Sequence, residues 1–187
     1  MTATATRSAP AAPPAPATDL HVVRSRAGRR VLSVLRIVVG WTFLWAFLDK
    51  TFALGFNTQA GNGWIEGGSP TTGYLMGASD GWFGPMWAAL AGTAVADWLF
   101  MLGLLGLGVA ALLGIGLRVA AVAGVALAVF MYASQLPLTG ATNPVTTAHW
   151  YYALLFVLFP LVDAGRTWGL AGLWERTGLV RAASWLR

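Results

Sequence analysis

Polar and ionisable side chains recur at the same end of each apolar stretch of this chain. Asp49 and Lys50 close the first stretch, Asp97 opens the second, Gln135 ends the third and His149 opens the fourth. Ionisable residues cost roughly 2.5 to 3.5 kcal/mol each at the centre of a bilayer, so repeated ones are usually paired, hydrated or functional. The pattern predicts one shared polar site at one face of a membrane.

The residue types at this predicted site suit proton and anion chemistry. Lys50 offers an ammonium group that attracts anions, and Asp49 stands beside it. His149 carries an imidazole, whose unperturbed pKa near 6.5 suits proton exchange around neutrality. We predict that His149, Asp97 and Glu66 are the catalytic residues, and that His149 exchanges protons together with Asp97 or Glu66. A quinone headgroup or a small oxyanion bound between helices would use these side chains.

Each of these residues also has a simpler structural role open to it. Lys50 at the end of a helix is able to extend its ammonium to the membrane surface. Asp97 at a helix N-terminus is favoured by the helix dipole. His149 precedes Trp150 and Tyr151, and all three side chains suit a membrane interface. The functional and the structural interpretations both remain open from sequence.

The residues that the chain lacks narrow its chemistry further. The sequence contains no cysteine and two histidines. Thiol–disulfide exchange and iron–sulfur clusters need cysteine, and a bis-histidine haem needs two histidines in the same domain, whereas His21 lies in the N-terminal tail. We predict no metal site. The expected electron carrier is a diffusible quinone or a cofactor that belongs to a partner protein.

The elements that position these residues are apolar runs. Of the 187 residues, 57% are hydrophobic and 10% are charged, which is typical of an integral membrane protein. A span needs roughly 20 residues, so we extend the short last run to reach from His149 to Trp168. The predicted spans are Val31–Leu48, Trp98–Leu117, Val119–Leu136 and His149–Trp168. We therefore expect an all-α integral membrane four-helix bundle.

The arginines predict the orientation of these spans. Short loops rich in Lys and Arg stay in the cytoplasm, and no Lys or Arg lies between Lys50 and Arg118. Eight arginines outside that interval flank the spans, at positions 24, 26, 29, 30, 166, 176, 181 and 187. This rule predicts a protein of the cell membrane with both termini in the cytoplasm. The polar site then lies at the outer face of the membrane. These flanking arginines lack the interleaved aromatics of a nucleic-acid site, so we expect lipid contacts and no nucleic acid partner.

The composition of the remaining segments predicts their structure. Residues 1–24 are rich in Ala, Pro and Thr and are predicted to be a disordered tail, which leaves residues 25–187 as one membrane domain. The outer segment from Thr51 to Thr93 is aromatic, with possible helix starts at Ser69-Pro70 and Gly84-Pro85, and predicts a structured loop of short helices. After Gly165 the apolar residues alternate with arginines, which predicts an amphipathic C-terminal segment at the interface.

Helical periodicity places further residues on common faces. Arg36, Gly40, Phe43, Phe47 and Lys50 follow one another at steps of four and three, so they share one face of the first span. Arg36 is the most deeply placed permanent charge, and it would hold the bundle together or meet a ligand or partner. The second and fourth spans carry similar stripes, which end at Arg118 and at Asp163. The small-residue spacings Ala110-x-x-x-Gly114, Ala120-x-x-x-Gly124 and Gly124-x-x-x-Ala128 predict close helix packing.

Three ordered motifs resemble the DoxX/DoxD family of four-span membrane proteins. They are Trp45-Ala46-Phe47-Leu48-Asp49-Lys50-Thr51-Phe52, then Trp64-Ile65-Glu66-Gly67-Gly68-Ser69-Pro70-Thr71, then Asp97-Trp98-Leu99-Phe100-Met101. Asn143-Pro144 before His149 and the later Trp168-Gly169-Leu170 agree with the pattern, which covers roughly residues 36–174. We add Asn143 to the candidate substrate-binding residues Lys50, Asp49 and Arg36.

The resemblance implies a redox-associated membrane subunit. DoxD is the large subunit of a thiosulfate:quinone oxidoreductase, so a sulfur anion such as thiosulfate and a membrane quinone are the expected substrates, with a protein partner subunit or a homo-oligomer. This sequence lacks a fused small-subunit domain. A non-enzymatic anchor for soluble redox or sulfurtransferase enzymes is the alternative, and a small-solute or proton conductor built on Arg36 and Asp163 is the third.

Overall fold

The regular elements of this protein are helices. The structure, a computed structural model, describes residues 22–138, 143 and 145–186. Within these residues it contains eight α-helices, two short 3-10 helices and no strand. The prediction of an all-α fold is therefore confirmed, while most of the predicted tail, residues 1–21, lies outside the described part of the chain.

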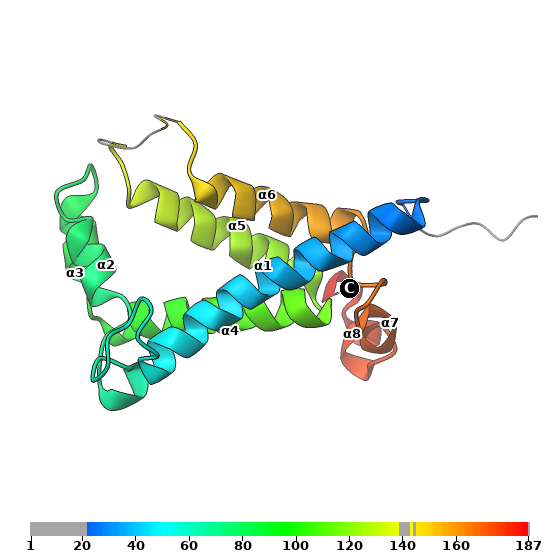
Figure 1. Ribbon diagram of the computed structural model, residues 1–187, viewed down its shortest axis with the longest axis horizontal. Helices are drawn as coiled ribbons and strands as arrows, with labels where there is room; N and C mark the ends of the chain where they lie inside the picture. The colour runs from blue at the N-terminus through cyan, green and yellow to red at the C-terminus, as the bar shows by residue number, and fades with distance from the viewer. Residues whose placement is uncertain (1–21, 139–142, 144, 187) are drawn as a thin grey trace, which may run out of the picture.

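Four longer helices form the body of the molecule. They are α1 (Arg26–Phe52), α4 (Ala94–Leu113), α5 (Leu117–Ala133) and α6 (Ala148–Leu161). Helix α1 packs mainly on α4, and α5 packs mainly on α6, whereas α4 and α5 touch each other less (Figure 1). Helices α1 and α4 are long and apolar enough to cross a membrane. Helices α5 and α6 are also apolar but have 17 and 14 residues.

Glycines allow the close approach within each helix pair. A Cβ atom added at Gly40 of α1 would lie 2.6 Å from the backbone nitrogen of Leu112, and one at Gly108 of α4 would lie 2.7 Å from that of Leu44. At the other pair, a Cβ at Gly124 of α5 would lie 2.6 Å from the ring of Phe156. The predicted packing role of the small residues around Gly124 is therefore confirmed.

Three predicted spans end earlier than expected, and the third of them, predicted to reach Leu136, ends with α5 at Ala133. Helix α4 stops at Leu113 because Gly114 adopts a left-handed conformation with φ of 69°, so Arg118 belongs to α5 and not to the stripe on α4. Helix α6 ends at Leu161 and does not reach Trp168, because Asp163 also has a positive φ, of 50°. The prediction that His149 and Asp163 share one helical face is therefore wrong.

Short helices occupy the segment between α1 and α4. The 3-10 helix η1 spans Trp64–Glu66, α2 spans Thr72–Gly77 and α3 spans Gly84–Leu90 with Pro85 in its first turn. The Trp87 side chain is 1% exposed and packs edge-on against Phe130 of α5, with ring centroids 4.7 Å apart. The predicted structured loop of short helices is confirmed.

The C-terminal segment folds back on the end of the molecule where α1 begins (Figure 1). It contains α7 (Ala171–Trp174), α8 (Gly178–Ala182) and the 3-10 helix η2 (Ser184–Leu186). The indole nitrogen of Trp174 donates to the Leu186 carbonyl at 2.8 Å, and Val180 is fully buried. Its exposed side chains are both apolar and basic, which agrees with an amphipathic segment.

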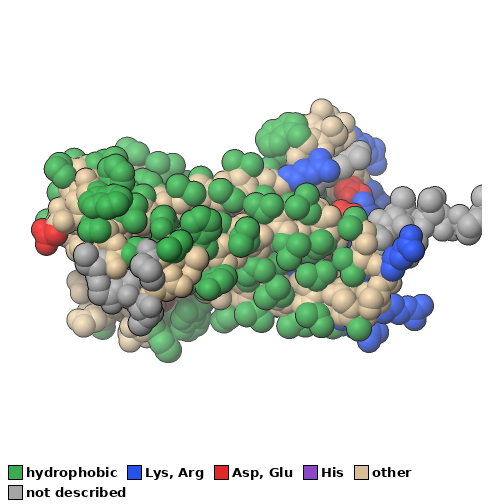
Figure 2. Space-filling model, turned by 90° about the horizontal axis from the view of Figure 1, so that it is seen from above, with side chains coloured by type: hydrophobic (Ala, Val, Ile, Leu, Met, Phe, Trp, Pro, Cys, Tyr) green, Lys and Arg blue, Asp and Glu red, His purple; other side chains and the backbone are tan. Residues whose placement is uncertain are grey.

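The surface over the long helices is apolar. Large exposed hydrophobic side chains include Val34 and Val38 of α1, Leu99 and Leu102 of α4, Val122 and Val129 of α5, and Leu154 and Leu161 of α6. Figure 2 shows hydrophobic side chains along the length of one face, with Lys and Arg gathered at one end. Within the protein, 22% of the apolar window of α1 and 33% of that of α4 are buried.

Candidate functional site

Lys50 and His149 line the same cavity. This space, which we call the head cavity, has a volume of about 230 Å³ and lies among α1, α4, α5 and α6. The side chains of Phe43, Leu104 and Tyr152 also line it. Two of the residues that the sequence predicted for a shared site, about 100 positions apart along the chain, are therefore brought together by the tertiary structure.

The ammonium group of Lys50 is available to a ligand. Lys50 lies in the last turn of α1, where the helix dipole favours a cation. Its side chain is half-buried, and its Nζ forms no hydrogen bond or ion pair with the residues that the structure describes. The carboxylate of the neighbouring Asp49 attracts this ammonium. A half-buried ammonium that donates no hydrogen bond favours a ligand oxygen that accepts one.

His149 is oriented by its own helix start. It lies in the first turn of α6, and its Nδ1 is 3.0 Å from the hydroxyl oxygen of Thr147, the residue just before that helix. This hydrogen bond engages one ring nitrogen and leaves Nε2 without a partner among the described residues. His149 is half-buried, so Nε2 is the ring atom placed to exchange a proton with a ligand or with water.

Aromatic rings form one wall of the head cavity. The ring of Phe43 packs edge-on against Tyr152, at 5.3 Å between centroids, and against Phe156, at 5.2 Å. Helical periodicity predicted that Phe43 shares a face with Lys50, but neither Phe43 nor Tyr152 was predicted to belong to the site. The available signal was their spacing, since Phe43 is two turns before Lys50 and Tyr152 is one turn after His149.

The two carboxylates predicted for this site point elsewhere. Asp49 is fully buried and accepts hydrogen bonds from the backbone nitrogens of Phe56, at 3.1 Å, and Asn57, at 2.9 Å. Asp97 accepts from the hydroxyl of Ser69 at 2.9 Å, and from the hydroxyl and backbone nitrogen of Thr71 at 2.5 and 3.2 Å. Both carboxylates therefore organise the segment between α1 and α4.

Glu66 and Asn143 also hold local backbone. Glu66 accepts from the backbone nitrogen of Gly63 at 2.9 Å, which closes η1. The exposed Asn143 accepts from the backbone nitrogens of Val145 and Thr146 at 2.8 and 3.0 Å, which forms a turn before α6. Neither side chain lines the head cavity, so the structure does not bring Glu66 or Asn143 to Lys50 and His149.

Arg36 lies at the opposite end of the molecule and is fully buried. Its guanidinium donates to the carbonyls of Ala111 and Leu112 at the end of α4, the latter at 2.9 Å. It also donates to the carbonyls of Ala164 and Trp168 after α6, at 3.2 and 3.0 Å. Arg36 therefore joins the helices, which is one of its two predicted roles. The structure does not bring Arg36 to Lys50 and His149 as a substrate-binding residue, because its guanidinium is taken up by these carbonyls.

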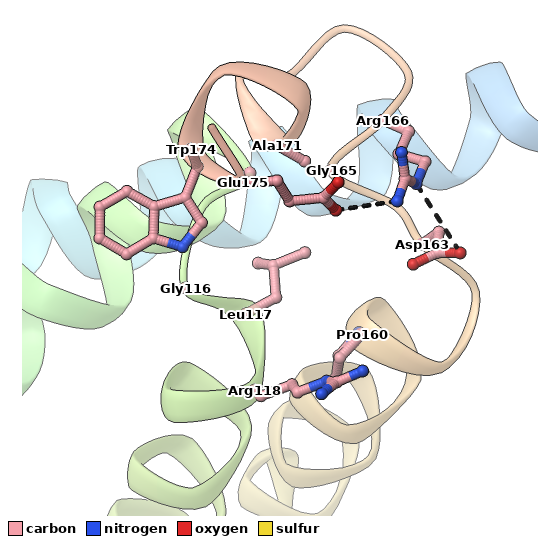
Figure 3. A pocket seen from close by; sticks show the side chains of 11 residues that line it. Gly116, Leu117, Arg118, Pro160, Asp163, Gly165, Arg166, Ala171, Trp174 and Glu175 are labelled. Atoms are coloured by element: carbon pink, nitrogen blue, oxygen red, sulfur yellow. Dashed lines mark hydrogen bonds and ion pairs between the residues drawn. The ribbon is translucent and has the colours of Figure 1, made fainter. Parts of the chain in front are cut away.

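Another cavity, which is polar, lies at the end of the molecule that contains Arg36. Its volume is about 240 Å³, and Figure 3 shows four charged side chains around it. Arg166 pairs with Glu175 at 2.8 Å and with Asp163 at 3.9 Å, whereas Arg118 forms no ion pair with the described residues. The two ion pairs are partly exposed and contribute little to stability. The order of these residues along the chain did not predict this cluster.

These observations define an all-helical protein with two candidate membrane-spanning helices and an apolar cavity that Lys50 and His149 both line. Comparison with protein-family models, with curated proteins and with solved structures found no match. The resemblance to the DoxX/DoxD family thus remains a prediction. Within the described residues, no group of three or more His, Asp or Glu side chains is placed to hold a metal ion.

Proposed function

We propose that this protein is a DoxX/DoxD-like, redox-associated subunit of the cell membrane that binds a quinone headgroup in the head cavity. The observation that carries the proposal is the joint presence of Lys50 and His149 in that one cavity. The wider reaction is the one that the resemblance implies. In it, two thiosulfate ions join through a new S–S bond to form one tetrathionate ion and release two electrons. The quinone takes up those two electrons and two protons to become a quinol.

Four membrane crossings, by α1, α4, α5 and α6, suit the surface of the protein. Helices α5 and α6 measure about 26 and 21 Å at 1.5 Å per residue, somewhat less than a hydrocarbon core of about 30 Å. Local bilayer thinning accommodates short helices at modest cost. The arginines gathered at one end, with the positive-inside rule, support cytoplasmic termini and an outward-facing Lys50.

The head cavity fits a ring of quinone size. Its volume of about 230 Å³ is below the roughly 300–1,000 Å³ of sites for drug-sized ligands, so it suits a headgroup without its chain. The rings of Phe43 and Tyr152 provide flat apolar contacts. In the proposed complex, Lys50 donates a hydrogen bond to a ring carbonyl and His149 exchanges a proton with the ring.

The proposal is tested by quinone binding to the purified protein in lipid nanodiscs. The probe is a short-chain benzoquinone, and the signal is quenching of tryptophan fluorescence. Lys50→Met and His149→Phe should each weaken binding by about tenfold, because each removes a hydrogen bond made in a dry cavity. Arg118→Met, which removes an unpaired cation outside the head cavity, is the matched control and should bind like wild type.

Quinone reduction with thiosulfate is the second measurement. Turnover by the protein with its partner subunit, lost in Lys50→Met and His149→Phe, supports the oxidoreductase. Unchanged quinone binding in both variants contradicts the proposed site, whatever the turnover.

The C-terminal segment supports one alternative, a membrane anchor for soluble redox enzymes. Leu179 and Trp185 are more than half exposed, and Arg176 and Arg181 lie beside them. In the anchor interpretation this surface recruits the soluble enzyme, and quinone binding is dispensable. Retention of a soluble redox enzyme by membranes of wild type, and its release by the double variant Leu179→Glu, Trp185→Glu, would favour the anchor.

A further inference from the structure

A larger apolar cavity adjoins the head cavity. It has a volume of about 430 Å³ and lies among α2, α3, α4 and α5. Val95, Leu99 and Gly103 of α4 line it on one side, and Ala123 and Ala126 of α5 on the other. We call it the side cavity.

The side cavity offers no free polar side chain to a ligand. Its two hydroxyls already have partners: that of Tyr74 lies 2.9 Å from the hydroxyl of Ser134, and that of Thr71 donates to Asp97 at 2.5 Å. A polar headgroup bound here would lose its hydrogen bonds to water without replacement, which is costly. The chemistry of the side cavity is therefore that of a hydrocarbon chain.

The two cavities share one wall. Phe100 of α4 and Leu127 and Met131 of α5 line both of them. This wall lies between α4 and α5, which pack less closely on each other than α1 does on α4 or α5 does on α6. The flexible side chain of Met131 adapts readily to a neighbouring group. A chain attached to a ring in the head cavity would reach the side cavity between these three side chains.

An apolar groove between α5 and α6 is the rival exit from the head cavity. It has a volume of about 270 Å³ and shares only Ala128 and His149 with the head cavity. Gly124 and Phe156 are in close contact at this helix pair, and α5 and α6 pack tightly. The smaller volume and the tighter packing favour the side cavity.

We propose that the side cavity binds the isoprenoid chain of the ligand whose ring occupies the head cavity. This inference rests on the proposed function, and it narrows the ligand to a long-chain membrane quinone that enters from the bilayer between α4 and α5. The two cavities then divide one amphiphile by polarity, with the ring beside Lys50 and His149 and the chain beyond Phe100, Leu127 and Met131.

The experiment compares two benzoquinones with the same ring, one with a single isoprene unit and one with several, in nanodiscs at equal mole fraction in lipid. The wild type should bind the long-chain quinone about tenfold more tightly. Gly103→Phe should remove this difference, because a side chain at Gly103 has open space on the side cavity and would fill it. Gly106→Phe is the matched control, since Gly106 also has open space but does not line the cavity.

The outcomes separate the inference from the function on which it rests. Equal affinity for both quinones in the wild type would contradict the proposal that the side cavity binds the chain, and so would a chain-length preference that persists in Gly103→Phe. Neither result would contradict ring binding in the head cavity. Binding of neither quinone by a folded wild type overturns the proposed function itself.

A photoreactive group at the end of the chain gives a test that needs no variant. Cross-links to Leu99, Gly103 or Ala126 are the expected result. Cross-links to Val129 or Leu154, which line the groove between α5 and α6, would place the chain in the rival exit and overturn the inference.

Discussion

Replacing Arg36 with methionine should destabilise the whole helical body, although Arg36 is far from the head cavity. The last four carbonyls of α4 have no partner within the helix. Gly114 and Ile115 donate to the carbonyl of Ala110, and Leu170 donates to that of Leu113 at 2.8 Å. The two carbonyls between them receive their hydrogen bonds from the Arg36 guanidinium.

The size of the expected loss in folding stability follows from these two carbonyls. A buried acceptor left without a donor costs about 1–3 kcal/mol, so the carbonyls of Ala111 and Leu112 together cost roughly 2–6 kcal/mol. Part of this loss of stability is offset in the variant, because an apolar methionine does not carry the desolvation cost of the buried guanidinium charge. We expect a net loss of about 3 kcal/mol, which lowers the melting temperature by roughly 6–12 °C in a protein of this size.

Thermal unfolding of Arg36→Met in detergent, followed by tryptophan fluorescence, measures this loss. Arg118→Met is the control, because Arg118 is exposed and unpaired, and it should stay within about 0.5 kcal/mol of wild type. Trypsin provides a local measurement: loss of the bonds to Ala164 and Trp168 should speed cleavage after Arg166 and Arg176. A melting temperature and a cleavage rate equal to those of wild type would refute the role given to Arg36.

Two further predictions concern the helix pairs and the segment between α1 and α4. Gly108→Ala should destabilise the protein by about 1–3 kcal/mol, because its Cβ would lie 2.7 Å from the backbone nitrogen of Leu44, whereas Gly106→Ala meets nothing within 4 Å and should be neutral or slightly stabilising in the same thermal assay. Asp97→Ala leaves the backbone nitrogen and hydroxyl of Thr71 without their acceptor and should cost roughly 2–3 kcal/mol. Faster proteolysis of residues 54–93 would report it, and an unchanged cleavage pattern would contradict it.

Local patterns were sufficient for much of the architecture. The apolar runs predicted the helical fold, the spacing around Gly124 predicted a close helix contact, and the position of Arg36 predicted a residue that joins helices. These features depend on residues a few positions apart or on a charge in an apolar run, so the sequence displays them directly. The boundary of α6 was missed because the turn after Leu161 is stabilised by contacts with Arg36, 128 positions away for the Ala164 carbonyl.

For the candidate site too, some features could be predicted from the sequence and others could not. The sequence by itself determined which ionisable side chains lie at the ends of the apolar runs, since that follows from their order along the chain. Only the tertiary structure decided which of them meet. Asp49, Asp97 and Glu66 accept hydrogen bonds from nearby backbone and hydroxyl donors, whereas Lys50 and His149 line one cavity formed by four helices. The physical reason is that a buried carboxylate takes the donors that the folded chain brings within reach, and those donors depend on loop geometry and helix packing.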